Sequence, residues 1–203
     1  MSILQRYLGG QQAAKQNAMA AMLPPSMGGG AAGDAGVAGA FGGAGAGYSG
    51  DPGNPSEIGQ RLMADLMRDF GLTQAQAAGV VGNLDHESGG FATLQEIDPM
   101  VEGSRGGYGY AQWTGPRRRA FEAWAADNGL DPASYEANYG FLRHELTATP
   151  EGAVVDKLRG VNSPDEAATV FSETFLRPGI PHMGSRVARA GKYFNPMSTY
   201  AGM

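Results

Sequence analysis

Apolar residues recur at the three- and four-residue spacing of a helix along most of the chain after residue 55. The first such run follows Ser56, a favourable N-cap residue, and stops at Gly71, which is suited to end a helix. Its apolar face consists of Ile58, Leu62, Met63, Leu66 and Phe70. The pattern predicts an amphipathic helix that packs on a hydrophobic core.

A second helix is predicted between Thr73 and the pair Gly89-Gly90. Thr73 and Gln76 fit a capping box at its start, and the glycines end it. Its core face consists of Ala77, Val80, Val81 and Leu84. Glu87 is therefore expected at a helix C-terminus, where the macrodipole and partial burial favour the protonated acid. A carboxyl group kept in that form can donate a proton near neutral pH, and the alternative is a solvated glutamate at a frayed helix end.

Three further helix starts follow along the chain. Thr114 is expected to begin a helix that ends at Gly129. Asp131-Pro132 and Ser163-Pro164 each place a cap residue before a proline at the first helical position, and we expect a helix after each pair.

Residues 184–194 are predicted to form the last helix, with Arg186 and Arg189 either exposed or paired with acids near a cleft. Strand character is confined to the segment from Tyr108 to Trp113 and the loop before it. The sequence therefore predicts a mainly α fold with at most a small β-hairpin flanking the cleft.

The glycine-rich segment that follows the second helix carries aromatic side chains. Tyr108, Tyr110 and Trp113 offer flat apolar faces, and Gln112 offers amide hydrogen bonds, a combination that suits sugar rings. The alternative is that the alternating aromatic residues form one face of a short buried strand.

Four stretches of the chain resemble one known family. They read GNLDHESGGF, then GGYGYAQWTGPRR, then FLRHEL, and finally FLRPGIPHMGSRVARAGKYF. In this order they are similar to the phage tail lysozyme family, a branch of the lysozyme-like superfamily of peptidoglycan-cleaving enzymes, over about residues 56–197. The resemblance implies a lysozyme-like fold and a peptidoglycan substrate.

The resemblance also implies roles for single residues. Glu87 would be the general acid that protonates the glycosidic oxygen between two amino sugars of peptidoglycan. Ser88, Tyr108 and Gln112 would line the cleft as substrate contacts. Trp113 and its neighbours Thr114 and Arg117 would serve either as structural support or as sugar contacts.

The identity of a second carboxylate decides the mechanism. A hydrolase needs a partner carboxylate about 5–5.5 Å away for retention or 6.5–9.5 Å away for inversion, whereas a lytic transglycosylase needs only the acid. Glu96, Asp98 and Glu102 lie in the loop before the aromatic segment, and we rank them in that order. The alternative for each is a solvated acid in a loop with no catalytic role.

Other chemistries find less support in the sequence. His86, His144 and His182 form no HExxH pair, so a zinc amidase or peptidase is the weaker alternative, and we expect neither a metal nor a cofactor. The chain has no cysteine, no GxSxG elbow and no phosphate-binding GK[ST] loop. Its net charge of −5 argues against general nucleic-acid binding, despite a basic patch at residues 117–119.

The N-terminal quarter of the chain differs from the rest in composition. Residues 1–27 are predicted to form an amphipathic anchor segment, residues 28–55 a tether rich in glycine and alanine, and residues 56–203 the lysozyme-like catalytic domain. The apolar residues near the start are interrupted too early for a secretion signal, and no membrane span is expected. We expect residues 1–50 to bind other virion proteins of the tail or internal core.

These observations favour a particle-borne peptidoglycan glycosidase that opens the bacterial cell wall during genome entry. Its location would be the virion, and its place of action the host wall or periplasm. A catalytically inactive structural or wall-binding tail protein is the alternative from another class. A free endolysin would share the chemistry and differ in location.

Overall fold

The computed structural model describes residues 55–97, 99 and 104–194. The chain divides into two units, Met1–Ala44 and Gly45–Met203, and all described residues belong to the second. The predicted anchor and all but the last residue of the predicted tether lie outside the described residues, as do Asp98 and Glu102.

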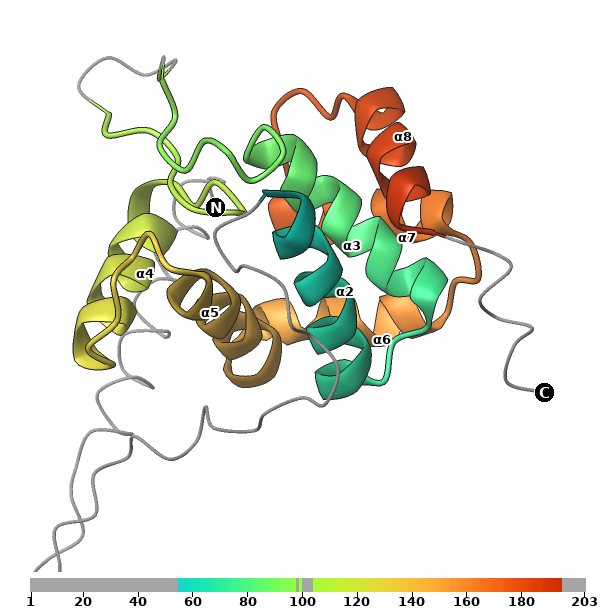
Figure 1. The fold of residues 1–203 in the computed structure, drawn as a ribbon, viewed down its shortest axis with the longest axis horizontal. Coiled ribbons are helices and arrows are strands. Elements are labelled where there is room, and N and C mark those ends of the chain that lie inside the picture. The colour runs from blue at the N-terminus through green and yellow to red at the C-terminus, as the bar shows by residue number, and fades with distance from the viewer. Residues whose placement is uncertain (1–54, 98, 100–103, 195–203) are drawn as a thin grey trace, which may run out of the picture. The chain divides into compact units, whose positions relative to one another are not determined.

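Helix α3 (Gln74–Glu87) lies at the centre of the described domain (Figure 1). It is buried without interruption from Ala75 to Asp85, so it is enclosed on all sides rather than on one face. The helices that contact it are α2 (Pro55–Phe70), α7 (Pro164–Phe171) and α8 (Met183–Tyr193). The capping box predicted at Thr73 and Gln76 is confirmed.

Two glycines of α3 allow this close packing. A Cβ atom at Gly79 would lie 2.4 Å from the Cβ of Ala167 in α7. A Cβ atom at Gly82 would lie 2.4 Å from the backbone nitrogen of Ala190 in α8. Both distances are far below van der Waals contact, so the neighbouring helices reach α3 only because these positions have no side chain.

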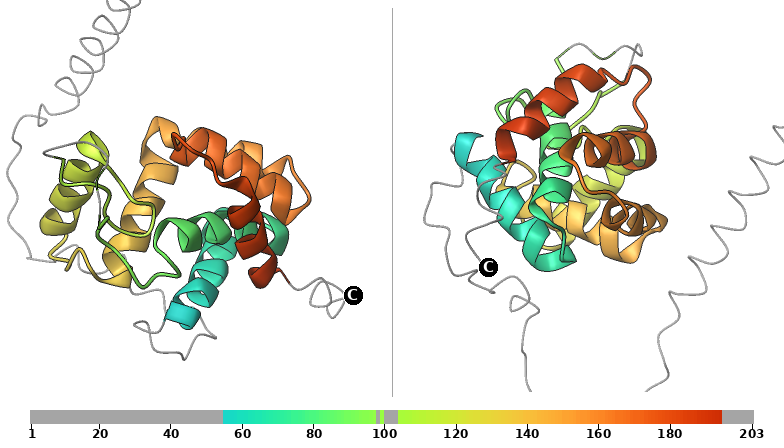
Figure 2. Two further views of the ribbon diagram at one scale, coloured as in Figure 1. Left: turned by 90° about the horizontal axis from the view of Figure 1, so that it is seen from above. Right: turned by 90° about the vertical axis from the view of Figure 1, so that its right-hand side faces the viewer.

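The remaining helices complete a mainly α domain. They are α4 (Gly115–Asp127), α5 (Tyr135–Ala148), the 3₁₀ turn η1 (Pro150–Gly152), α6 (Ala153–Arg159) and the π-helical turn η2 (Ser172–Leu176). Figure 2 shows α4 on one side of α3, with α7 and α8 on the other. An aromatic cluster joins α4 to α5, in which the Trp113 ring lies 4.8 Å from Phe121 and 5.1 Å from Phe141 between centroids.

The segment between α3 and α4 contains no regular strand among its described residues. Tyr108 and Trp113 exchange two backbone hydrogen bonds of 3.0 and 2.9 Å, and a second isolated bridge pairs Tyr108 with Gln95. The expected small hairpin is thus reduced to two bridges. The prediction of a mainly α fold is confirmed.

The predicted helix boundaries are confirmed for most elements. Ser163 forms a capping box with Glu166 at the start of α7, and Thr114 is the N-cap of α4. The predicted helix at 184–194 is α8, and α2 starts at Pro55, so Ser56 lies inside its first turn rather than before it.

The start predicted for α5 was wrong by three residues. The Asp131 carboxylate accepts the backbone N–H of Ala133 at 2.9 Å and thereby caps a turn ahead of the helix. Ser134 is the N-cap of α5, because its hydroxyl accepts the N–H of Ala137 at 3.1 Å. The Asp-Pro signal therefore marks the turn that precedes the helix.

None of the described helices combines the length and the apolar character that crossing a membrane requires.

We expect Gly82→Ala to lower the free energy of unfolding by about 1–3 kcal/mol, because the new methyl group overpacks the contact between α3 and α8. Gly191→Ala is the matched control. Gly191 lies in α8 with no heavy atom near its would-be Cβ, so alanine is expected to be neutral or to stabilise by up to about 1 kcal/mol. Urea denaturation of both variants measures the difference, and equal effects would contradict the packing argument.

Candidate active site

Glu87 is the last residue of α3, as the sequence predicted. Its side chain is 18 % exposed, and its Oε1 atom lies 2.8 Å from Nη2 of Arg186 in α8. The carboxylate thus lies at the rim of the buried core with a cation beside it. Arg186 compensates a negative charge that the C-terminus of a helix would otherwise disfavour.

Arg186 is buried, with 2 % of its side chain exposed. Its Nη1 donates to Oδ1 of Asn83 at 3.1 Å, and its Nε donates to the carbonyl of Pro181 at 2.6 Å. Each of the three guanidinium nitrogens therefore has a partner. Of the two environments considered for Arg186, the structure shows the paired one.

A second ion pair, next to the pair of Glu87 with Arg186, joins the same two helices. Arg189 pairs with the buried carboxylate of Asp85, and the Tyr193 hydroxyl donates to the other Asp85 oxygen at 2.8 Å. Burial, together with the donated hydrogen bond, raises the pKa of Tyr193. Asp85 was not considered from sequence, although it lies two residues before Glu87 in the DHES stretch.

His86 lies between these two pairs. Its Nδ1 is 3.0 Å from the Ser185 hydroxyl, and its ring centroid is 5.8 Å from that of His182. Burial lowers the pKa of His86 to about 4, and the positive charges of Arg186 and Arg189 act in the same direction. The imidazole beside Glu87 is therefore neutral at neutral pH.

The third histidine lies apart from this group. His144 belongs to α5, where its ring lies 5.9 Å from Phe141 and 6.2 Å from Trp124 between centroids. Within the described ranges, no group of three or more His, Asp or Glu side chains is placed to hold a metal ion.

Ser88, a predicted substrate contact, is fully buried. Its hydroxyl donates to the Leu84 carbonyl at 2.7 Å and accepts the N–H of Phe91 at 3.0 Å. Both hydrogen bonds shape the turn that follows α3. In this structure the side chain has no surface to offer a sugar.

Glu96, the first choice for a second carboxylate, is half-buried and holds a backbone turn. Its Oε2 accepts the N–H of Gly107 at 2.6 Å, and its own N–H donates to the Gly107 carbonyl at 2.9 Å. These contacts fix the start of the aromatic segment. Asp98, the second choice, lies outside the described residues.

The aromatic segment is more enclosed than its composition indicates. Tyr110 and Trp113 are buried, with 3 % and 1 % exposed, whereas Tyr108 and Gln112 are half-buried. The Gln112 amide donates to the carbonyls of Leu94 and Gly109, each at 2.9 Å. The structure therefore does not gather these side chains on one exposed face.

The sequence profile of the phage tail lysozyme family matches residues 59–197. This range is well over half of the chain and contains Glu87, the aromatic segment and α8. The chain belongs to the phage tail lysozyme family. The resemblance seen in the sequence is thereby confirmed, and a search of curated proteins finds no match. The family indicates a phage-associated, lysozyme-like glycosidase that acts on the cell wall, with peptidoglycan as a consistent substrate.

Glu145 of α5 ties two matched residues of this family member together. The residue is 4 % exposed, and its carboxylate accepts the Trp113 indole N–H at 2.7 Å. The carboxylate also accepts hydrogen bonds from Nε and Nη2 of Arg117 at 2.8 and 2.7 Å. Arg117 also lies 4.6 Å from the centroid of the Phe175 ring. Of the two roles considered for Trp113 and Arg117, these contacts favour structural support. Glu145 lies in the stretch FLRHEL, which resembles the family, but the sequence alone indicated no role for this residue.

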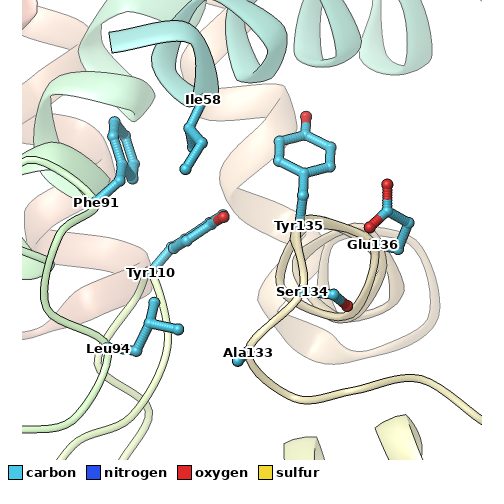
Figure 3. A pocket seen from close by; sticks show the side chains of 8 residues that line it. All are labelled: Ile58, Phe91, Leu94, Tyr110, Ala133, Ser134, Tyr135 and Glu136. Carbon is cyan, nitrogen blue, oxygen red and sulfur yellow. The ribbon is translucent and has the colours of Figure 1, made fainter. Parts of the chain in front are cut away.

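A pocket of about 300 Å³ lies beside the aromatic segment (Figure 3). Its lining consists of Ile58, Phe91, Leu94, Tyr110, Ala133, Ser134, Tyr135 and Glu136. Tyr110 points into it between the apolar side chains, and burial raises the pKa of Tyr110 to about 12. The hydroxyl therefore stays protonated. The pocket combines apolar side chains with a few polar groups, which is the usual make-up of a small-molecule site.

The low pKa of His86 predicts a loss of stability in acid. The unfolded chain takes up the proton near pH 6.5, whereas the folded chain does so only near pH 4. The stability present above pH 6.5 is therefore lost as the pH falls toward 4. We expect His86→Asn, whose amide can still bond Ser185, to show a flatter melting temperature over pH 4–7 than wild type. Parallel curves would contradict this assignment.

We expect Glu145→Gln to lower the free energy of unfolding by about 2–4 kcal/mol, because Arg117 loses its charged partner at a buried acceptor. The control is Glu136→Gln, on the same helix, whose exposed pair with Arg61 is worth less than about 1 kcal/mol. Chemical denaturation of both variants tests the difference. A Glu145→Gln loss no larger than that of the control would show that this cluster does not support the fold.

Proposed function

We propose that this chain is a particle-associated peptidoglycan glycosidase in which Glu87 is the general acid. The observation that carries the proposal is the Glu87 carboxyl at the end of the buried helix α3, partly exposed and paired with the buried Arg186. A general acid needs a fixed position, access to the substrate and a charge environment that tolerates the carboxylate left after proton transfer. Glu87 combines these three properties.

The reaction begins with proton transfer from Glu87 to the glycosidic oxygen between two amino sugars. The bond to the leaving sugar breaks, and Glu87 remains as a carboxylate beside Arg186. A second carboxylate then directs water, or the substrate closes on itself to give an anhydro sugar. Glu96 and Asp98 are the proposed second groups, and one Glu96 oxygen is engaged by Gly107.

Sugar contacts are proposed on the segment after α3. Tyr108 and Gln112 are half-buried and keep part of their surface in solvent, and Tyr110 lines the 300 Å³ pocket. Ser88 and Trp113 contribute by shaping the backbone that carries these groups, since both are buried and hydrogen-bonded. Flat apolar faces with few polar groups suit a glycan strand.

The place of action is proposed from the sequence. Residues 1–50 would attach the enzyme to other virion proteins, and the domain would open the host wall locally while the genome enters. A free endolysin would use the same chemistry without that attachment. Co-purification of the full chain with intact phage particles separates the two.

We expect Glu87→Gln to lose at least about 100-fold in cleavage rate, because the amide keeps the shape but cannot donate the proton. The measurement is mass spectrometry of fragments released from purified peptidoglycan by the full chain. Glu173→Gln, at an exposed residue of η2, is the matched control and should cleave like wild type.

The products and the failures have distinct meanings. Reducing-end sugars from wild type identify a lysozyme, and anhydro sugars identify a lytic transglycosylase. Equal release by wild type and Glu87→Gln would remove Glu87 from the mechanism. No release by either would favour a structural or wall-binding protein.

A further inference from the structure

Each guanidinium nitrogen of Arg186 has its own partner. Its Nη2 meets Glu87, its Nη1 meets Asn83, and its Nε meets the Pro181 carbonyl, so every nitrogen is aimed at a different partner. A planar guanidinium with three directed donors has one orientation in such a site. The Glu87 carboxyl is therefore held at a defined place relative to α3, α8 and the loop before α8.

The orientation of Arg186 is fixed in turn by Asn83. This fully buried amide donates to the carbonyls of Gly79 and Ala168, at 2.9 and 3.0 Å, which uses both of its hydrogens. Its oxygen is left to accept from Arg186. A continuous chain of hydrogen bonds thus runs from α7 through Asn83 and Arg186 to Glu87.

Stability alone is a weak reason for this arrangement. Moving a guanidinium out of water costs several kcal/mol, and well-packed apolar residues often serve a fold as well as a buried ion pair. The neighbouring Arg189 gives a contrast on the same helix. It also joins α8 to α3 through a carboxylate, but that carboxylate belongs to Asp85 and Arg189 remains 28 % exposed.

The geometry points to Arg186 as the positioning residue for the Glu87 carboxyl, holding it in one orientation toward the glycosidic oxygen and stabilising the carboxylate that remains after proton transfer. This inference rests on the proposed role of Glu87. Arg186 acts through Glu87 and not through the substrate, so its loss reduces kcat and leaves KM nearly unchanged. A small misplacement of a catalytic group costs up to about 100-fold in rate.

The test compares full-length Arg186→Gln, Arg186→Lys, Arg189→Gln and Glu87→Gln with wild type on solubilised peptidoglycan. Circular dichroism reports the fold, and initial rates from pH 4 to 9 give kcat, KM and the pH profile. The other charged and titratable groups around this helix end are Asp85, His86, His182, Arg189 and Tyr193, and they are unchanged in the two Arg186 variants.

We expect Arg186→Gln to fold with lower stability, to lose about 10- to 100-fold in kcat, and to keep KM within a few-fold. Arg186→Lys should restore part of kcat, since lysine supplies the charge but not three directed bonds. Arg189→Gln should lose stability while keeping the wild-type kcat and pH profile.

If Arg186→Gln folds and keeps the wild-type kcat while Glu87→Gln is inactive, the inference is overturned and the proposed function stays intact. Wild-type activity in Glu87→Gln would overturn the proposed function itself. If Arg186→Gln does not fold, Arg186→Lys decides: reduced kcat at unchanged KM supports the positioning role, and wild-type kcat overturns it.

Discussion

Close packing around α3 is the constraint on which the domain depends. The helix is buried along most of its length, and its neighbours approach so closely that a Cβ atom at Gly79 or Gly82 would lie 2.4 Å from an atom of the facing helix. A helix with one apolar face can shift on its core, but a helix enclosed on all sides has little room to move. Glu87 ends this helix a little more than one turn after Gly82, so its position is fixed by the same packing.

Enclosure also explains where the charges of the domain are found. Three polar side chains in the second half of α3 pair with arginines of α8. Arg186 meets Asn83 and Glu87, and Arg189 meets Asp85. Because the packing of α8 on α3 depends on Gly82, the same contact that builds the core brings both arginines to their partners. Packing and electrostatics at the site are therefore one structural feature.

The sequence predicted those parts of the fold that depend on local signals. The capping box at Thr73, the helix start at Ser163-Pro164 and the position of Glu87 at a helix end follow from neighbouring residues, and the structure agrees. The start of α5 was misplaced because Asp131 and Ser134 both cap, one a turn and the other a helix. The short helix α6 was missed, because one turn of apolar residues gives a weak periodic signal.

The partners of the site residues depend on the tertiary fold and were harder to predict from the sequence. That Arg186 and Arg189 pair with acids was one of two open alternatives, and no local rule selects Glu87 for Arg186. The DHES stretch presents four polar residues in a row, yet the structure gives them different surroundings. Ser88 is sealed by backbone hydrogen bonds, while Glu87 retains part of its exposure.

The segment after α3 shows why residue types alone overestimate how many side chains are exposed to a substrate. Among its described residues, some backbone polar groups pair with one another across isolated bridges, and Glu96, Gln112 and Arg118 each bind backbone atoms of this segment as well. Glu96, predicted as a second catalytic carboxylate, and Gln112, predicted as a sugar contact, thus also hold the loop in place. A catalytic role for Glu96 is compatible with this duty, because a carboxylate anchored by Gly107 is already oriented. The same anchoring means that removing the Glu96 carboxylate would disturb the loop as well as the chemistry, so an activity loss at Glu96 alone has two explanations. The product's reducing or anhydro end shows instead whether the reaction uses water, and therefore whether a second carboxylate is needed to direct that water.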